Sequence, residues 1–130
     1  MKFSAEQILK YILDKYGKRC PLGIYILEYF MAQNLVAITE SAGRLTGVII
    51  FRKTKLKDYD DRERMAHNKK GDCAFVVELC ADSKEDIASL EYQMRNRLGK
   101  TKHLGMHRGG KAHFYDYEKF MKKLLGKDRL

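Results

Sequence analysis

The sequence predicts an α+β fold in which helices flank a mostly antiparallel central sheet. Segments with apolar residues at helical spacing alternate with short runs of β-branched and aromatic residues, which are typical of strands. Turn sequences at residues 41–44 and 109–110 join neighbouring strand-like runs and favour antiparallel pairing. A chain of 130 residues fits one domain that buries roughly two-thirds of its unfolded surface. We therefore expect residues 1–130 to form a single domain.

Two helices are predicted near the N-terminus. Ser4 and Gln7 form a capping box in front of an apolar helical face, and Gly17 provides the end of that helix. After Pro21, a second helix is predicted over Leu22–Gln33. Because its residues are apolar nearly all round, we expect this second helix to be largely buried.

A β-hairpin and a long loop come next. The hairpin strands are predicted at residues 35–39 and 45–53, with residues 41–44 as the turn. Residues 54–72 are rich in charged side chains and almost free of apolar ones. We expect an exposed, mobile loop there, with one helical turn at most.

The second half of the chain supplies the central strand and its helix. Residues 73–81 form a short apolar run that fits a central strand. Asp82 is predicted to cap the following helix, with Glu85 at its third position and Gly99 at its end. The apolar face of this helix consists of Ile87, Leu90, Met94 and Leu98.

A second hairpin and a last helix complete the chain. Gly109-Gly110 is a two-residue turn signal between strands at 102–108 and 111–115. Asp116 is predicted to cap the final helix, whose apolar stripe consists of Tyr117, Phe120, Met121, Leu124 and Leu125.

Composition limits the class of protein. Apolar residues make up 45% and charged residues 33%, the balance of a globular protein. No apolar run approaches the roughly 20 residues that span a bilayer, so we expect no membrane partner and a cytoplasmic location. The three cysteines, Cys20, Cys73 and Cys80, are dispersed without a C-x-x-C spacing and are interpreted as reduced packing residues.

The positive charge is concentrated at the C-terminal end. The net charge is +9, and residues 95–130 contain eleven Lys and Arg against three Asp and Glu. Such a distribution favours an anionic partner: nucleic acid, a phosphorylated cofactor or an acidic carrier protein. A solvated surface that keeps the protein soluble is the alternative.

Three neighbouring histidines suggest a metal site that strand geometry opposes. A two-residue turn at Gly109-Gly110 pairs Arg108 with Lys111, which puts His103 and His107 on one face and His113 on the other. We therefore expect no metal. The same register sets His103 opposite Asp116, so the alternatives are an oriented His–Asp pair or half-exposed structural histidines.

Glu78 is the acidic side chain of an otherwise apolar strand, residues 74–81. If it is desolvated, its pKa rises toward the range useful for a general base. If it lies on the exposed face, a salt bridge to Lys or Arg accounts for it equally well.

Two basic patterns bear on anion binding. Arg108 and Lys111 flank Gly109-Gly110 and combine cations with backbone amides, so that they can hold a phosphate, although a plain hairpin tip explains them too. The second pattern alternates cations with aromatic rings, as nucleic-acid-binding surfaces do. Its cations are Lys100, Lys102, Arg108 and Lys111, and its rings are His103, His107, Phe114 and Tyr115; a basic binding module would use Arg95 together with these four cations.

The order of elements resembles the middle of the GNAT superfamily of acyltransferases, and more narrowly the toxin-activating lysine acyltransferases. The resemblance covers most of residues 17–110. The segments that carry it are Arg19-Cys20-Pro21, residues 33–39, Gly71-Asp72 before the strand with Glu78, and residues 94–98.

This resemblance implies transfer of an acyl group from a thioester to an amine, such as a protein lysine. The donor would be acyl-CoA, acetyl-CoA included, or an acyl carrier protein. Its pantetheine arm would pair with the backbone of Leu79, Cys80 and Ala81. Glu78 would act as base or orienting carboxylate, and Tyr115 or Tyr117 would protonate the departing thiolate.

The sequence departs from these families at two places. The position of the catalytic histidine in the toxin-activating enzymes falls near Gly17, and the Arg/Gln-x-x-Gly-x-Gly/Ala loop does not follow the central strand. A catalytically silent relative with a structural role is therefore an alternative, as is a basic binding module for nucleic acid or an acidic protein.

Overall fold

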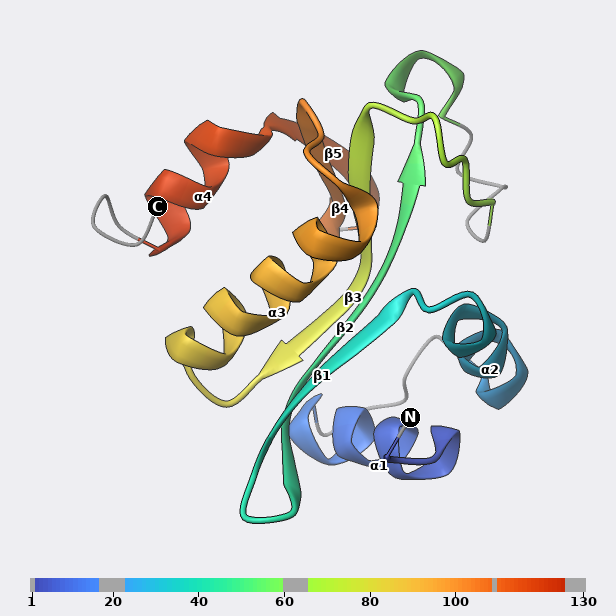
Figure 1. The fold of residues 1–130 in the computed structure, drawn as a ribbon, viewed down its shortest axis with the longest axis vertical. Helices are drawn as coiled ribbons and strands as arrows, with labels where there is room; N and C mark the ends of the chain where they lie inside the picture. The colour runs from blue at the N-terminus through green and yellow to red at the C-terminus, as the bar shows by residue number, and fades with distance from the viewer. Residues whose placement is uncertain (1, 17–22, 60–65, 109, 126–130) are drawn as a thin grey trace.

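Five strands form one mixed sheet in the order β1-β2-β3-β4-β5 in the computed structural model of the chain (Figure 1). The structure describes residues 2–16, 23–59, 66–108 and 110–125. Three of the four strand pairs are antiparallel, and β3 and β4 are parallel. The strands are β1 (Val36–Ser41), β2 (Arg44–Thr54), β3 (Cys73–Ala81), β4 (His103–Arg108) and β5 (Lys111–Asp116).

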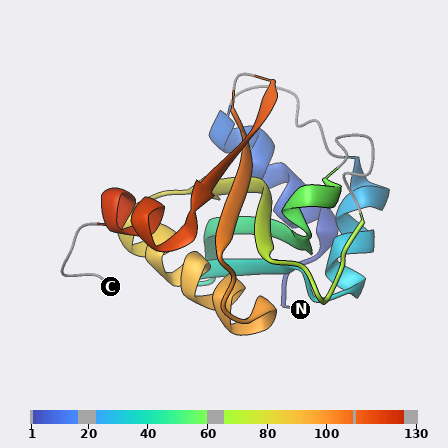
Figure 2. The same cartoon turned by 90° about the horizontal axis from the view of Figure 1, so that it is seen from above.

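Helices cover both faces of this sheet. Figure 2 shows the strands between α3 and α4 on one side and α1 and α2 on the other. The parallel pair β3 and β4 is joined by the crossover helix α3, as parallel strands require. The helices are α1 (Ala5–Tyr16), α2 (Ile24–Ala32), α3 (Lys84–Leu98) and α4 (Tyr117–Leu125).

The prediction of an α+β fold with a mostly antiparallel sheet and flanking helices agrees with this architecture. The predicted strand at residues 73–81 is the middle strand of the sheet. The register predicted for the second hairpin is also confirmed: Arg108 pairs with Lys111 and His103 with Asp116. Gly109 lies outside the described residues.

Both predicted caps at the ends of the chain are present. The Ser4 hydroxyl accepts from the Gln7 backbone N–H at 3.2 Å, and the Gln7 side chain accepts from the Ser4 N–H at 2.8 Å. The Asp116 carboxylate accepts from the Lys119 backbone N–H at 3.1 Å and caps α4. Gly17, predicted to end α1, lies outside the described residues.

The predicted cap of α3 is shifted by one residue. Ser83, and not Asp82, is the N-cap, because its hydroxyl accepts from the Asp86 backbone N–H at 3.1 Å. Asp82 instead binds α1, accepting from the Tyr11 hydroxyl at 2.8 Å and pairing with Lys15 at 3.0 Å. A long-range partner thus takes the carboxylate that the local pattern assigned to the helix.

The expectation that the second helix is largely buried is wrong. Within α2, Leu27 and Phe30 are fully buried, but Tyr25 is 84% exposed and Tyr29 is 45% exposed. The helix therefore packs along one narrow stripe. Composition could not show this, since tyrosine is apolar enough for a core and polar enough for a surface.

The described parts of the predicted loop at 54–72 are tied to the end of β2. The Lys53 backbone N–H donates to Nδ1 of His67 at 3.0 Å, and the Leu56 N–H donates to the Asp72 carboxylate at 2.9 Å. One short helical turn is present, as predicted, in the form of a 3₁₀ turn at Leu56–Asp58. The expectation of a mobile loop also covers residues 60–65, which lie outside the described residues.

The core lies between the sheet and the helices. It includes Ile8 and Ile12 of α1, Phe30 of α2 and Leu90 and Met94 of α3, all at most 2% exposed. Cys73 and Cys80 are buried free thiols, while Cys20 lies outside the described residues. Among the described helices, none is both long and apolar enough to cross a membrane.

Candidate functional site

The parallel strands β3 and β4 pair over only half of β3. Their ladder runs from Cys73 opposite His103 to Val76 opposite Met106 and ends there. On its other side, β3 has a bulge, because Glu78 pairs with Ile50 of β2 whereas Val76 pairs with the next residue. Beyond Val76 the two strands diverge, and the C-terminal half of β3 borders a gap that we call the β3–β4 gap.

Two residues of β3 direct their backbone groups into this gap. In an antiparallel pair, alternate residues bond to the same neighbouring strand. The Asp82 N–H donates to the carbonyl of Thr46, the residue before Gly47 in β2, at 2.8 Å. Alternation from Asp82 therefore turns Leu79 and Ala81 away from β2 and toward the gap. The Tyr16 hydroxyl confirms the direction, since it donates to the Leu79 carbonyl.

Glu78 is half-buried on the side of the sheet that faces α1. Burial raises the pKa of its carboxyl above the usual value, and this effect outweighs two opposing ones. Two neighbouring groups, the Tyr16 hydroxyl and the Leu79 backbone N–H, favour the charged carboxylate. Of the two interpretations that the sequence left open, desolvation is the one found.

A cavity opens on the other side of the gap, against α4. Its volume is about 720 Å³, compared with about 400 Å³ for a hollow at the start of α4. The half-buried residues that line it come from β3, α3, β4, β5 and α4, so five elements meet there. Its floor is apolar and consists of Leu79, Ile87, Met106, Phe120 and Leu124.

Three cations stand at the mouth of this α4 cavity. Arg108, Lys119 and Lys123 line it and are all exposed, and the exposed carboxylate of Asp116, which lines it as well, leaves the mouth positive on balance. Arg108 also donates to the Tyr115 hydroxyl at 3.3 Å. An apolar floor below a positive mouth is suited to a ligand with an apolar chain and an anionic head.

The two predicted catalytic tyrosines occupy different environments. Tyr115 lines the α4 cavity, where its ring packs against Phe120 at 4.7 Å between ring centres. Tyr117 is buried between α3 and α4, and its hydroxyl donates to the Glu91 carboxylate at 2.8 Å. Burial, together with the charge of Glu91, raises the pKa of Tyr117 far above its usual range. The structure thus brings Tyr115, but not Tyr117, to the cavity.

The residues predicted to bind a cofactor are also divided. Leu79 borders both the gap and the cavity, and the Ala81 backbone faces the gap. Cys80 lies opposite Val48 of β2, and burial raises the pKa of its thiol. Arg108 reaches the cavity, whereas Lys111, its partner in the hairpin register, is exposed and does not line it.

The start of α3 is already occupied by side chains of the protein. The Ser83 hydroxyl takes the Asp86 N–H and donates to the Asp86 carboxylate at 2.8 Å. Thr46 of β2 donates to the same carboxylate at 3.1 Å. The negative charges of Glu85 and Asp86 in the first turn also disfavour a pyrophosphate there.

The histidines take part in ring packing and in hairpin pairing. His107 contacts the Tyr59 hydroxyl at 3.2 Å and packs edge-on against Phe75, while His113 stacks on Tyr115. No group of three or more His, Cys, Asp or Glu that could hold a metal occurs among the described residues. His103 lies opposite Asp116 as predicted, but the bond recorded for the Asp116 carboxylate goes to the α4 backbone.

The basic and aromatic residues proposed to contact nucleic acid do not form one open surface. Phe114 packs with Tyr59 and Phe75 at 5.0 and 6.1 Å between ring centres, so its ring is part of an internal cluster. Arg95 pairs with Glu91 at 3.2 Å. Stacking of bases on Phe114 would require this cluster to separate.

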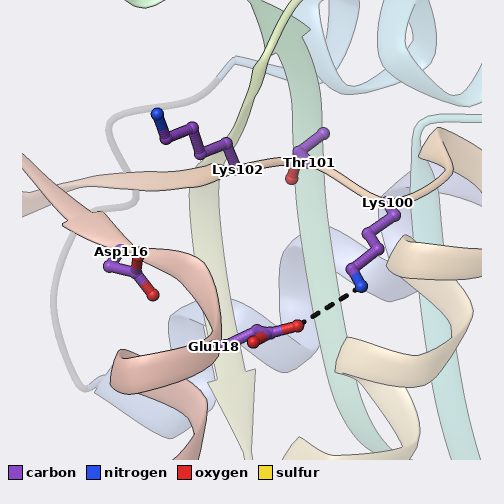
Figure 3. Close-up of a pocket in the computed structure, with 5 residues that line it drawn as sticks. All are labelled: Lys100, Thr101, Lys102, Asp116 and Glu118. Atoms are coloured by element: carbon purple, nitrogen blue, oxygen red, sulfur yellow. Dashed lines mark ion pairs between the residues drawn. The ribbon is translucent and has the colours of Figure 1, made fainter.

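A smaller hollow of about 400 Å³ lies at the start of α4 (Figure 3). Lys100 pairs there with Glu118 at 3.4 Å, and the Lys102 side chain extends away from that pair. Asp116, which caps α4, lies with Glu118 on the acidic side of this hollow. Because opposite charges already meet in this hollow, it offers less to an anionic ligand than the α4 cavity does.

Three residues near the gap were missed by the reasoning from sequence. By sequence, Tyr16 is only the residue before the predicted helix end at Gly17, and Lys119 and Lys123 count only toward the positive charge of residues 95–130. The spacing of Lys119 and Lys123, four residues apart, did place both on one face of the last helix. For Tyr16 there was no local signal, since its partner Leu79 is 63 residues away.

No known protein-family model matches this chain, and a search of curated proteins found no match to it either. The functional assignment therefore depends on the geometry of the β3–β4 gap and the α4 cavity.

Proposed function

We propose that this protein is an acyltransferase that moves an acyl group from a CoA or acyl-carrier-protein thioester to an amine. The observation that carries the proposal is the divergence of β3 and β4, which leaves a strand edge between a desolvated carboxyl on the α1 side of the sheet and a cavity with a positive mouth on the α4 side. This combination fits a GNAT-like fold, in which a thioester lies between two such strands.

The α4 cavity matches the parts of such a donor. Its apolar floor accommodates an acyl chain, which gains about 0.8 kcal/mol for each buried methylene group. Arg108, Lys119 and Lys123 attract the phosphates of CoA or the acidic surface of a carrier protein. The amide groups of the donor arm find the Leu79 and Ala81 backbone in the gap.

Glu78 is suited to the proton transfer of this reaction. The amine nitrogen attacks the thioester carbonyl carbon, a C–N bond forms, and the C–S bond breaks. Glu78 accepts the proton that the amine loses, because its raised pKa makes it a stronger base than an exposed carboxylate. Tyr115, at the cavity, donates its proton to the departing thiolate and regains one from solvent.

Ligand-dependent thermal stability tests binding first. Acetyl-CoA, longer acyl-CoAs and free CoA are compared at increasing concentration. A ligand at one hundred times its dissociation constant adds about 2.7 kcal/mol, which raises the midpoint of unfolding by roughly 10 °C for this size. We expect the longer acyl-CoAs to give the larger shift at equal concentration.

Charge reversal on α4 tests the location of the ligand. Lys119→Glu with Lys123→Glu removes two of the three cations at the cavity mouth and is expected to weaken acyl-CoA binding at least tenfold. Lys122→Glu is the matched control, because Lys122 is exposed on the same helix but lines a different hollow. Equal loss of binding in both variants would place the ligand elsewhere.

The chemical step is tested with Glu78→Gln. This variant is expected to retain the acyl-CoA shift and to lose roughly 10²–10⁴-fold in kcat for acyl transfer to an amine. Full activity would exclude Glu78 as the base. If no thioester, carried by CoA or by a carrier protein, shifts the midpoint, the proposal fails. Steeply salt-dependent binding of nucleic acid would then support the basic binding module.

A further inference from the structure

The two backbone groups of Leu79 that face the β3–β4 gap are both engaged by side chains. The carbonyl accepts from the Tyr16 hydroxyl, and the Glu78 carboxylate lies close enough to the N–H for that group to favour its charged form. These contacts join two elements, the end of α1 and two adjacent positions of β3. Tyr16 and Glu78 thus hold the positions that a neighbouring strand would take on β3.

An extended chain with amide groups would need the same positions. A chain that lies along a strand edge exchanges N–H···O=C bonds with alternate residues of that strand. In that alternation, Leu79 lies between Val77 and Ala81. An arm that lies in the gap must therefore either bond to Leu79 or run alongside it. A backbone N–H has one proton to donate, so the Glu78 carboxylate must leave it before the arm can use it.

Tyr16 lies partly at the surface, so its ring can move aside more readily than a core residue can. It is 45% exposed, at the last position of α1, and its hydroxyl can reach water once it leaves the Leu79 carbonyl. Tyr11, one turn earlier, stays bound to Asp82 at 2.8 Å and keeps α1 in position. Release of the hydroxyl therefore does not require the helix to detach.

We propose that Tyr16 is a positioning residue whose hydroxyl caps the Leu79 carbonyl, beside Glu78, until the amide-bearing arm of the donor displaces it. This inference rests on the proposed function, because it assigns the arm to a thioester donor. It adds two points. Without a donor, the contact between Tyr16 and Leu79 closes the β3–β4 gap, and donor binding then releases Glu78.

Displacement also changes the basicity of Glu78. In the closed arrangement, the Tyr16 hydroxyl and the Leu79 N–H both favour its charged form and oppose the effect of burial. When the arm takes Leu79, burial acts without these bonds, and the pKa of Glu78 rises further. The carboxylate thereby becomes a stronger base when a donor is present.

Binding of pantetheine to Tyr16→Phe tests the inference. Pantetheine carries the two amides of the donor arm and no phosphate, so it reports on the strand edge rather than on the cations. Loss of one competing hydrogen bond is expected to tighten its binding about fivefold. Tyr29→Phe is the matched control, because Tyr29 is also 45% exposed and lies on α2. It is expected to leave the affinity unchanged.

A second measurement does not depend on ligand affinity. The pKa of Glu78, followed by carbon NMR of its carboxyl group, is expected to rise in Tyr16→Phe without ligand and in the wild type on adding pantetheine. In the acyl-transfer assay, the acidic limb of the plot of kcat against pH is expected to move to higher pH together with the pKa of Glu78. The KM for the donor is expected to fall in Tyr16→Phe.

The outcomes separate this inference from the proposed function. If wild type and Tyr16→Phe bind pantetheine and CoA equally and the pKa of Glu78 is the same in both, Tyr16 is not a cap, and acyl transfer stands. If neither protein binds pantetheine or CoA, both proposals fail. Tighter binding by Tyr16→Phe alone supports the cap.

Discussion

Glu78 shows how a single residue can be costly to the fold and still be retained in a strand. Its carboxyl is half-buried beside α1, and burial raises its pKa despite two hydrogen bonds that favour the charge. A raised pKa means that the folded state disfavours the ionised form. The free energy of unfolding is therefore lowered at any pH where Glu78 is charged, and this penalty disappears as pH falls.

Glu78→Gln is expected to be more stable than the wild type at pH 7.5, because the amide keeps both hydrogen bonds without the charge. The difference should shrink as pH drops through the raised folded pKa and vanish below about 4.5, where the unfolded carboxyl is protonated too. Urea unfolding at several pH values measures this. A variant that is less stable at every pH would show that the charge itself stabilises the fold.

His67 is a second residue whose protonation is coupled to folding. Its Nδ1 accepts the Lys53 backbone N–H, and burial, with the nearby charges of Lys69, Lys53 and Arg52, lowers its pKa below 6.5. A lowered histidine pKa means that the unfolded state binds the proton more readily. The contribution of His67 is therefore complete above about pH 6.5 and is lost as pH falls toward the folded pKa.

His67→Asn keeps a hydrogen-bond acceptor near the same place and removes the titration. The midpoint of unfolding of the wild type is expected to fall more steeply than that of the variant between pH 6.5 and 5. Parallel curves over that interval would show that the Lys53–His67 bond does not hold the loop in solution.

Among the elements, α3 and α4 are joined by a buried polar contact. The Glu91 side chain is only 8% exposed and is bound by Tyr117 at 2.8 Å and Arg95 at 3.2 Å. Tyr117 thus stabilises the packing of α4, which carries the cations of the cavity mouth. The resemblance to acyltransferases implied a catalytic role for Tyr117. Its burial and its bond to Glu91 instead give it a structural role.

Tyr117→Phe is expected to lower the free energy of unfolding by about 1–3 kcal/mol, since a buried carboxylate loses a partner. Tyr92→Phe is the control, because Tyr92 is 56% exposed on the same helix as Glu91 and a phenyl ring keeps its contact with Arg95. Its stability should stay within about 0.5 kcal/mol of the wild type. Chemical denaturation of both variants measures these differences. Equal stability of the two variants would show that the Tyr117–Glu91 bond does not stabilise the packing of α4.

For the molecule as a whole, helix α3 protects one edge of the sheet. The alternation of β1 turns the carbonyls of Val36 and Ile38 away from β2, since Leu35 accepts from Phe51 at 3.1 Å. Arg97 donates to the Val36 carbonyl, and Gln93 donates to the Ile38 carbonyl at 2.9 Å. Side chains from α3 therefore occupy acceptors that another strand could use.

Replacing both donors, Gln93→Ala with Arg97→Ala, is expected to increase self-association through the β1 edge and to cost about 1 kcal/mol for each lost bond. Sedimentation velocity over a range of protein concentrations measures the first effect. Asn96→Ala, at an exposed position of the same helix, serves as the control. Identical sedimentation of all three proteins would show that the edge is protected by other means.

The sequence alone determined the local elements of this protein. The Ser4–Gln7 capping box, the Asp116 cap and the register of the β4–β5 hairpin were all predicted correctly. Each depends on residues close together in the chain, so the spacing of residue types contains the necessary information.

Only the tertiary structure decided how the candidate site is built. The divergence of β3 from β4, the contact of Tyr16 with Leu79 and the exposure of Tyr25 on α2 all depend on segments that are distant in the chain. Contacts with a distant segment also explain why the predicted cap of α3 was wrong. Asp82 binds Tyr11 and Lys15 of α1 instead of capping its own helix. Periodicity reports which face of an element is apolar, whereas the partner that covers this face is chosen by the packing of the whole chain.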